Sequence, residues 1–468
     1  MKTEPATTHD KALQINLDGS RYGTFAEIGA GQEVARWFFK VGGAAGTVAK
    51  TMSAYDMAVS DAIYGTAERY VSRARLQTML DHEWTLLLQR LAGARGAKTC
   101  FFVFADTVAT RSFTRQEDGR GWLGLRFQTS PGADASEIRL HARLWDQDNI
   151  RQQEALGVLG VNLIHAAFYR HAQPEALIGA LMDGLTRDRV EVDAIKFNGP
   201  AFAGLDGRLI TLQLVHQRLT NAAIFTADGE AVEPTEVLYG KPVLIERGSF
   251  RPVTKVTLDM LERALEQMRK TRGDQEREPV SLMEMTLRHL TGAQPGLDHA
   301  DFLARVDTLG ELGQTVMISN YSRFHSVAVY LRRYTRGRIA MVMGIPTLAA
   351  LFDEQHYADL DGGILEALGR LFKGEVKLYV YPWRNSAHGE WVTAASFTPP
   401  PHLRHLYTHL LENGYVEALR ASDGCRVDIQ SQEVLKLIQH GDATWEALVP
   451  DPIVKRIKRD GLFGWKPA

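Results

Sequence analysis

The 468 residues have an ordinary globular composition, 45% hydrophobic and 24% charged, which excludes a disordered or fibrous chain. This length exceeds the roughly 250 to 300 residues that one hydrophobic core organises, so two domains are expected. The 54 Lys and Arg residues balance 56 Asp and Glu residues, and charge therefore gives no support for a nucleic-acid or membrane-surface role.

Apolar segments alternate with helical patterns through the first 270 residues, which is typical of a mixed α/β fold. Strands are predicted at residues 22–28, 99–104, 123–128, 138–144, 190–197 and 243–246. Helices are predicted at residues 75–91, 153–169 and 174–185, where leucines and other apolar residues recur at helical spacing.

A charged stretch at residues 268–279, MRKTRGDQEREP, is poor in core-forming residues and predicts a linker. We therefore expect an N-terminal α/β domain at residues 1–270 and a helix-rich α/β domain at residues 280–468. In the second, strands are predicted at residues 315–319, 339–342 and 376–381, and helices at residues 301–312, 323–334, 364–372, 402–413 and 431–440.

Targeting and metal-binding signals are missing from the sequence. The first twenty residues are polar, and no run approaches the roughly 20 apolar residues of a membrane helix, so a cytoplasmic protein without membrane attachment is expected. Cys100 and Cys425 stand far apart, which argues against a disulfide framework or a cysteine zinc site. The fifteen histidines form no dense ligand set, and the metal, if any, stays unknown.

The glycine-rich stretch at residues 23–56 carries the strongest functional signal. Gly29 and Gly31 follow an apolar strand and precede an amphipathic segment, the strand–turn–helix order that cradles phosphate against helix N–H groups. Val34 stands where the third glycine of a G-x-G-x-x-G fingerprint belongs, so the dinucleotide pattern is incomplete.

A second glycine cluster follows, with Gly42, Gly43 and Gly46 before Lys50 and Thr51. It resembles a phosphate-binding loop that ends in Lys-Thr at a helix start, although alanines occupy the two Walker glycine positions. All seven residues of the two clusters are predicted to hold the anion.

Within this stretch Lys50 is also a catalytic candidate, and Asp56 a substrate-binding one. The alternative is that the glycines let helices and strands pack closely.

Two further strand ends carry polar residues. Asp193, Lys196 and Asn198 lie near the carboxyl end of a strand, where ligands bind in open α/β sheets. Lys196 is a catalytic candidate, and the other two are substrate-binding candidates. The alternative, an ordinary surface lysine, is the simpler explanation of Lys196.

The second strand end, LIERGSFRPVT at residues 244–254, places Arg247 and Arg251 around a glycine turn, and Thr257 is predicted to cap the next helix. Two arginines can grip phosphate or carboxylate bidentately. Arg247 is predicted to act in catalysis, whereas Ser249 and Arg251 are predicted to bind the second substrate. A solvent-exposed turn is the alternative.

A hydrolase interpretation rests on other residues. The VMISNYS segment at residues 316–322 resembles the second motif of haloacid-dehalogenase-like phosphatases, and FFVFADTV offers Asp106 as the nucleophile. Val108 stands where the second aspartate of that motif belongs.

The blocks FAEIGAGQEVARWFF, GTVAKTMSAYD, IKFNGPAF, LIERGSFRPVT and GGILEALGRLFK resemble a family of largely uncharacterised bacterial proteins, some labelled nicotinate-nucleotide adenylyltransferase. The resemblance implies nucleotidyl transfer from ATP onto a pyridine mononucleotide, with magnesium. Adenylyltransferases carry a G-x-F-x-P-x-H type motif whose histidine helps hold the ATP phosphates, and Gly23-Thr24-Phe25 begins similarly. Ile318-Ser319-Asn320 echoes their later I-S-S-T-x-x-R type motif.

We therefore expect a cytoplasmic enzyme that binds a small phosphate or nucleotide ligand and no nucleic acid. A non-catalytic scaffold, in which the glycine-rich segment packs subunits of a homo-oligomer, is the alternative, and a phosphatase-like hydrolase is a further one.

Overall fold

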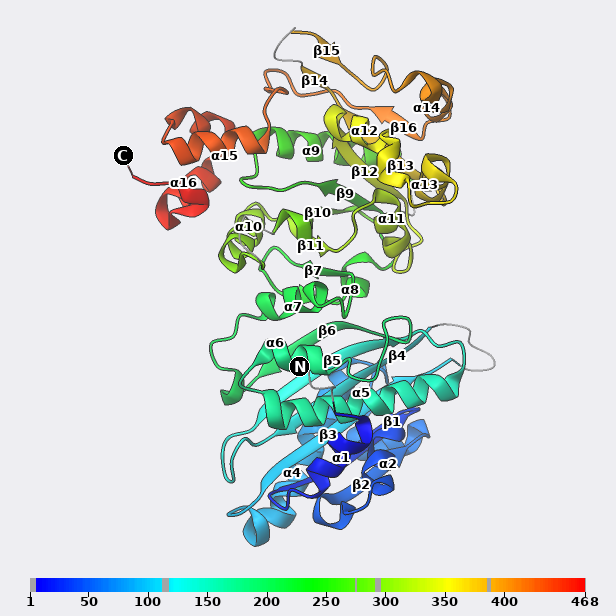
Figure 1. Cartoon of the computed structure of the whole chain (residues 1–468), viewed down its shortest axis with the longest axis vertical. Helices are drawn as coiled ribbons and strands as arrows, with labels where there is room; N and C mark the ends of the chain where they lie inside the picture. The colour runs from blue at the N-terminus through cyan, green and yellow to red at the C-terminus, as the bar shows by residue number, and fades with distance from the viewer. Residues whose placement is uncertain (1–5, 112–117, 274–275, 291–295, 385–388, 468) are drawn as a thin grey trace. The chain divides into compact units, whose positions relative to one another are not determined.

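The computed structural model describes residues 6–111, 118–273, 276–290, 296–384 and 389–467. They form two compact units, residues 1–220 and 221–468, each built on its own mixed sheet (Figure 1). The predicted α/β class with two regions is confirmed.

The first unit is a six-stranded sheet with helices on both faces. Its strands are β1 (Arg21–Gly29), β2 (Val48–Ala54), β3 (Cys100–Ala109), β4 (Gly119–Phe127), β5 (Ser136–Leu144) and β6 (Val190–Asn198). Its helices are α1 (Thr8–Asn16), α2 (Glu33–Lys40), α3 (Met57–Tyr64), α4 (Arg73–Arg95), α5 (Asn149–Arg170), α6 (Pro174–Ala180) and α7 (Gly207–His216). The strand order is β2-β1-β3-β4-β5-β6, with β2, β1 and β3 parallel and the remaining pairs antiparallel.

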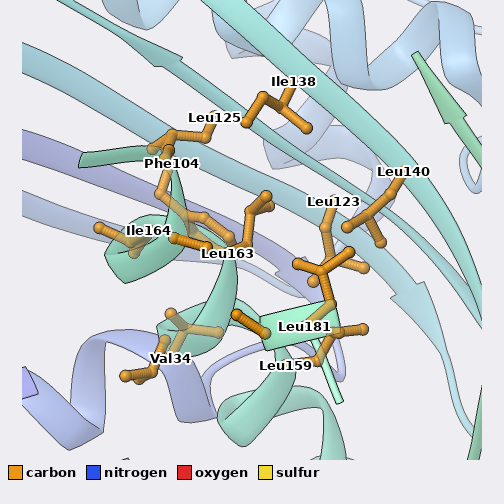
Figure 2. Close-up of a cluster of buried hydrophobic side chains, with 14 of the residues drawn as sticks. Val34, Phe104, Leu123, Leu125, Ile138, Leu140, Leu159, Leu163, Ile164 and Leu181 are labelled. Carbon is orange, nitrogen blue, oxygen red and sulfur yellow. The ribbon is translucent and has the colours of Figure 1, made fainter. Parts of the chain in front are cut away.

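Alternating side chains divide the core of this unit between two faces. One face packs against α1, α2, α5 and α6, and Figure 2 shows side chains of β3, β4 and β5 meeting Leu159, Leu163 and Ile164 of α5. The other face packs against α4 through Leu76, Met79 and Leu80. Full burial of such aliphatic side chains stabilises the fold by about 1.5–3 kcal/mol each.

The second unit has an eight-stranded sheet and a small hairpin. Its strands are β7 (Ala222–Phe225), β8 (Ala231–Val232), β9 (Val243–Arg247), β10 (Val280–Thr286), β11 (Thr315–Ser319), β12 (Ile339–Gly344), β13 (Val376–Tyr381), β14 (Trp383–Arg384), β15 (Trp391–Val392) and β16 (Val416–Ala418). Its helices are α8 (Pro234–Leu238), α9 (Lys255–Lys270), α10 (His299–Glu311), α11 (Phe324–Arg332), α12 (Ile345–Leu351), α13 (Gly363–Leu371), α14 (Arg404–Glu412), α15 (Ser431–His440) and α16 (Asp451–Asp460).

This larger sheet has the order β16-β13-β12-β9-β10-β11-β7-β8. The six strands from β16 to β11 are parallel, whereas β7 and β8 extend the edge antiparallel. The chain builds β9, β10 and β11 outward in one direction, and then returns to add β12, β13 and β16 on the other side of β9. The strand order therefore reverses between β9 and β12.

The charged stretch at residues 268–279 lies inside the second unit, apart from residues 274–275, which fall outside the described residues. The observed division at residues 220–221 differs from the predicted one because α9, which ends at Lys270, connects two adjacent strands, β9 and β10. Arg269 and Arg272 pair with Glu278, and Arg338 pairs with Glu276. The charged residues of this stretch therefore form ion pairs around the connection from β9 through α9 to β10.

Candidate functional site

The carboxyl ends of β9 and β12 form the topological switch point of the second sheet. In doubly wound α/β sheets, ligands bind in the crevice outside the strand ends at this point, because the connections leave there in opposite directions. The segment that leaves β9 is the turn Gly248 to Thr254, which leads into α9.

The turn has the G-x-F-x-P spacing at Gly248, Phe250 and Pro252, with Thr254 in the histidine position of the adenylyltransferase motif. Phe250 is 3% exposed and so fastens the turn to the core. Thr254 is the N-cap of α9, and its hydroxyl accepts a hydrogen bond from the N–H of Thr257 at 3.3 Å. The prediction that Thr257 is the cap is therefore wrong, since the helix begins at Lys255.

Arg247 joins three segments at the switch point. Its guanidinium binds Glu284 of β10 bidentately, with Nε and Nη2 at 2.7 and 2.8 Å. It also donates to the carbonyls of Tyr321 and Ser322 and lies over the ring of Phe324. These contacts link the ends of β9 and β10 to the segment that follows β11, and the catalytic role of Arg247 stays a prediction.

Arg251 and Ser249 are held by α10. Arg251 Nε lies 2.7 Å from a carboxylate oxygen of Asp301, which also pairs with Arg305. Arg305 is buried and donates to the carbonyl of Ser249 at 3.0 Å. These contacts tie the turn to α10, and the side chains of Arg251 and Lys255 are 35% and 49% exposed beside it.

His289 lies close to the backbone of Gly248. Burial lowers the pKa of its imidazole, and the positive charges of Arg247 and Arg305 lower it further. At neutral pH this imidazole is uncharged, and its Nδ1 accepts a hydrogen bond from the N–H of Thr286 at 3.3 Å. The sequence interpretation missed His289 and Arg305, since only strand order brings them to the turn.

The first glycine cluster lies at the carboxyl end of β1, where the carboxyl group of Glu27 already supplies hydrogen-bond acceptors. Its carboxyl oxygens accept hydrogen bonds from the N–H groups of Val34 and Ala35, at 3.0 and 3.4 Å, in the first turn of α2. Gly31 adjoins the carboxyl group of Asp106, and Gly29 has a positive φ of 75° against the carbonyl of Val108. The N–H groups predicted to bind phosphate therefore have a partner within the chain.

The second glycine cluster also makes contacts within the unit. The amide of Asn16 donates to the carbonyl of Gly42 at 2.6 Å, and a side chain at Gly43 would meet Asn16. Gly46 ends a single 3-10 turn before β2.

Lys50 and Thr51 lie in the strand β2 rather than at a helix start, so they point to opposite faces of the sheet. Lys50 pairs with Glu83, which also accepts from the hydroxyl of Tyr64. Asp56 caps α3 by accepting from Val59 N–H at 3.1 Å. Phosphate binding by this stretch stays a prediction. In the structure Lys50 and Asp56 already have partners within the chain.

Glu27 and Asp106 are directly paired residues of β1 and β3, and both are buried. Burial raises the pKa of Glu27 to about 8. Burial also raises the pKa of Asp106 well above its ordinary value, and the Glu27 charge adds to this. A fully enclosed acid that favours its protonated form does not suit the nucleophile of a phosphatase.

The candidates of β6 lie in two different environments, and the β5–β6 pairing shifts register beside Asp193, so simple strand alternation does not hold there. Asp193 is buried and pairs with His141 and Arg143 of β5. Lys196 and Asn198 are exposed on the same face of the sheet. The structure therefore places Lys196 and Asn198 near each other and Asp193 in a separate buried network.

Across the described ranges, no three His, Cys, Asp or Glu side chains are grouped closely enough to hold a metal ion. No helix in this part of the chain has the length and apolar character required to span a membrane.

Comparisons with known proteins show only remote similarity. No family model matches the chain, and no curated protein matches it. One similar solved structure is the Plasmodium falciparum nicotinic acid mononucleotide adenylyltransferase complexed with NaAD, at 11% identity and TM-score 0.30, covering 48% of this chain and 98% of that one. Another is a competence-damaged protein (CinA) superfamily protein from Enterobacter cloacae, at 11% identity and TM-score 0.25, covering 36% and 96%. Similarity at this level says nothing about what the chain does.

A test of the first glycine cluster follows from the position of Gly31. We expect Gly31→Ala to lower the free energy of unfolding by about 1–3 kcal/mol, because a methyl group there collides with the Asp106 carboxyl group. Urea denaturation measures the loss. Gly19→Ala is the matched control, since nothing lies within 4 Å of a methyl group at that position. Equal stability of the two variants would remove the packing explanation.

Proposed function

We propose that the second unit binds a nucleotide through its phosphates at the turn between β9 and α9. The observation that carries the proposal is the G-x-F-x-P turn at the point where the strand order reverses. The resemblance to adenylyltransferase-labelled proteins supports the same ligand class. A turn bonded to α10, the N-terminus of the 16-residue helix α9 and two partly exposed cations support this ligand class.

We extend the proposal to nucleotidyl transfer from ATP onto a pyridine mononucleotide. Thr254 replaces the histidine of the motif, and a hydroxyl cannot supply positive charge to a phosphate. Lys255 and Arg251 are then the side chains assigned to the phosphates, where they would stabilise charge that develops during transfer. Magnesium is assigned to the ATP phosphates, because this ion is commonly held by substrate phosphates and few carboxylates.

Binding is tested by isothermal titration of the full chain with ATP and magnesium. We expect Lys255→Ala to weaken binding by about ten- to a hundredfold, the effect of losing one charge-assisted contact. Lys50→Ala in the first unit is the matched control and should leave the affinity unchanged.

A loss of affinity in Lys50→Ala alone would move the site to the glycine-rich stretch and contradict the proposal. Transfer is assayed separately, as pyrophosphate released from ATP in the presence of nicotinate mononucleotide. Binding without release would retain the nucleotide site and remove the transfer.

A further inference from the structure

The face of the first sheet that packs against α4 also carries polar and charged side chains, on β5 and β6. The sequence of β5, SEIRLHARL, alternates strictly, and Ile138 and Leu140 join the core on the α5 side. Glu137 and Arg139 therefore point to the opposite face, along with Arg126 of the neighbouring β4. On this face α4 covers the parallel strands and β4 through its apolar residues.

A pocket of about 410 Å³ opens on this face, a size within the range of small-molecule sites. Its lining includes Gln77, Trp84, Arg126, Glu137, Arg139 and Asn198. All of them belong to the first unit and to described residues. Trp84 comes from α4, and the charged side chains come from the sheet.

The side chains of the pocket are held in place by one another. Arg139 donates to Gln77 Oε1 at 2.5 Å, and its Nη2 lies 2.7 Å from the Asn198 oxygen in the amide orientation that satisfies both groups. Arg126 Nε donates to Glu137 at 2.8 Å. The side chains of Arg126, Arg139 and Glu137 are 17%, 13% and 9% exposed, so this is not an ordinary solvated face.

Positive charge is in excess at the pocket: its lining carries Arg126 and Arg139 against Glu137, and Lys196 lies outside the lining on the neighbouring β6. Arg139 stands directly opposite Lys196 on β6, and like charges at such cross-strand positions repel. Arg126 lies on the next strand, and Glu137 is the single carboxylate of the lining that both arginines share. Asp81 also pairs with Arg126, but it is 57% exposed at the rim. A bound anion would relieve the repulsion between Arg139 and Lys196.

We propose that this pocket binds a small organic anion, a carboxylate or a phosphate ester, with its charge on Arg139 and Lys196 and its apolar part against Trp84. Arginine offers a planar pair of donors that matches either anion, and a flat apolar group can stack on an indole ring. The site is separate from the turn at β9 and does not depend on the function proposed for it.

The test uses the fluorescence of the full chain with benzoate, phenyl phosphate and uncharged benzamide as probes. We expect one or both anions, and not benzamide, to change the emission saturably, and the two anions distinguish a carboxylate site from a phosphate site. Trp84→Phe should remove the change, which separates Trp84 from the other seven of the eight tryptophans.

Arg139→Gln is expected to raise the dissociation constant at least about tenfold, and Lys196→Gln about threefold. Arg36→Gln, at a side chain 71% exposed elsewhere in this unit, is the control and should bind normally. Because Lys196 is exposed, its variant is informative even if Arg139→Gln fails to fold. An equal response to benzamide, or unchanged affinity in folded Arg139→Gln and Lys196→Gln, would overturn the proposal.

Discussion

Replacing Asp193 with alanine is expected to lower the free energy of unfolding by about 3–5 kcal/mol, the cost of breaking a buried ion pair. The Asp193 carboxylate is fully buried, 2.5 Å from His141 Nδ1 and 2.8 Å from Arg143 Nε. Burial by itself would raise the pKa of this carboxyl, but His141 and Arg143 outweigh burial and lower it. In the variant, His141 and Arg143 of β5 lose their carboxylate partner.

Urea denaturation of the full chain at pH 7 measures the loss caused by Asp193→Ala. Asp134→Ala, at an exposed aspartate of the same unit, is the control and should change stability by less than about 0.5 kcal/mol. The pH dependence of the unfolding free energy is a second test of the same network. A carboxyl whose pKa is lowered by folding stabilises the fold above its unfolded pKa of about 3.9 and loses this contribution as the pH falls through the folded value. A loss below about 1 kcal/mol for Asp193→Ala would contradict the buried network.

The Glu27–Asp106 pair predicts the opposite dependence on pH. Both acids have pKa values raised by folding, Glu27 to about 8, so the folded state keeps protons that the unfolded state releases. The contribution of this pair to the free energy of unfolding is therefore largest below the unfolded pKa values of about 4. It falls as the pH rises toward 8, by at most about 1.4 kcal/mol per pH unit for each group.

Asp106→Asn removes one of these titrations together with its charge repulsion against Glu27. We expect the variant to be more stable than the wild type at pH 8 and to lose less stability between pH 5 and pH 8. Unfolding midpoints in urea across this range measure the slope. Asp134→Asn should reproduce the wild-type slope, and an Asp106→Asn slope as steep as the wild type would show that Asp106 is already ionised.

Much of the second unit was predictable because its signals are local. The observed bounds of β11, β13 and α15 equal the predicted ones, since each is a short apolar or amphipathic run bounded by turn residues. The sequence does not predict the strand β2, because the glycines and polar residues around it resemble a phosphate-binding loop. From the sequence alone, Lys50 could bind phosphate or pair with a carboxylate, and only the tertiary structure places Glu83, 33 residues away, beside it.

The sequence contains two candidate starts of the G-x-F-x-P-x-H motif, at Gly23 and at Gly248. The sequence alone does not show which of them lies at a ligand site. The strand order separates the two candidates, since β9 stands at the reversal of its sheet, whereas the N–H groups that follow β1 bind Glu27.

Periodicity and turn chemistry act over a few neighbouring residues, so the α/β class, many helices and strands, and the polar residues that end the strands follow from the sequence alone. Which strands are neighbours follows from the tertiary structure. That choice sets Glu27 against Asp106, Arg139 against Lys196, and the Gly248 turn at the switch point. Such pairings depend on sheet register between distant segments, which the buried faces of the whole sheet determine together.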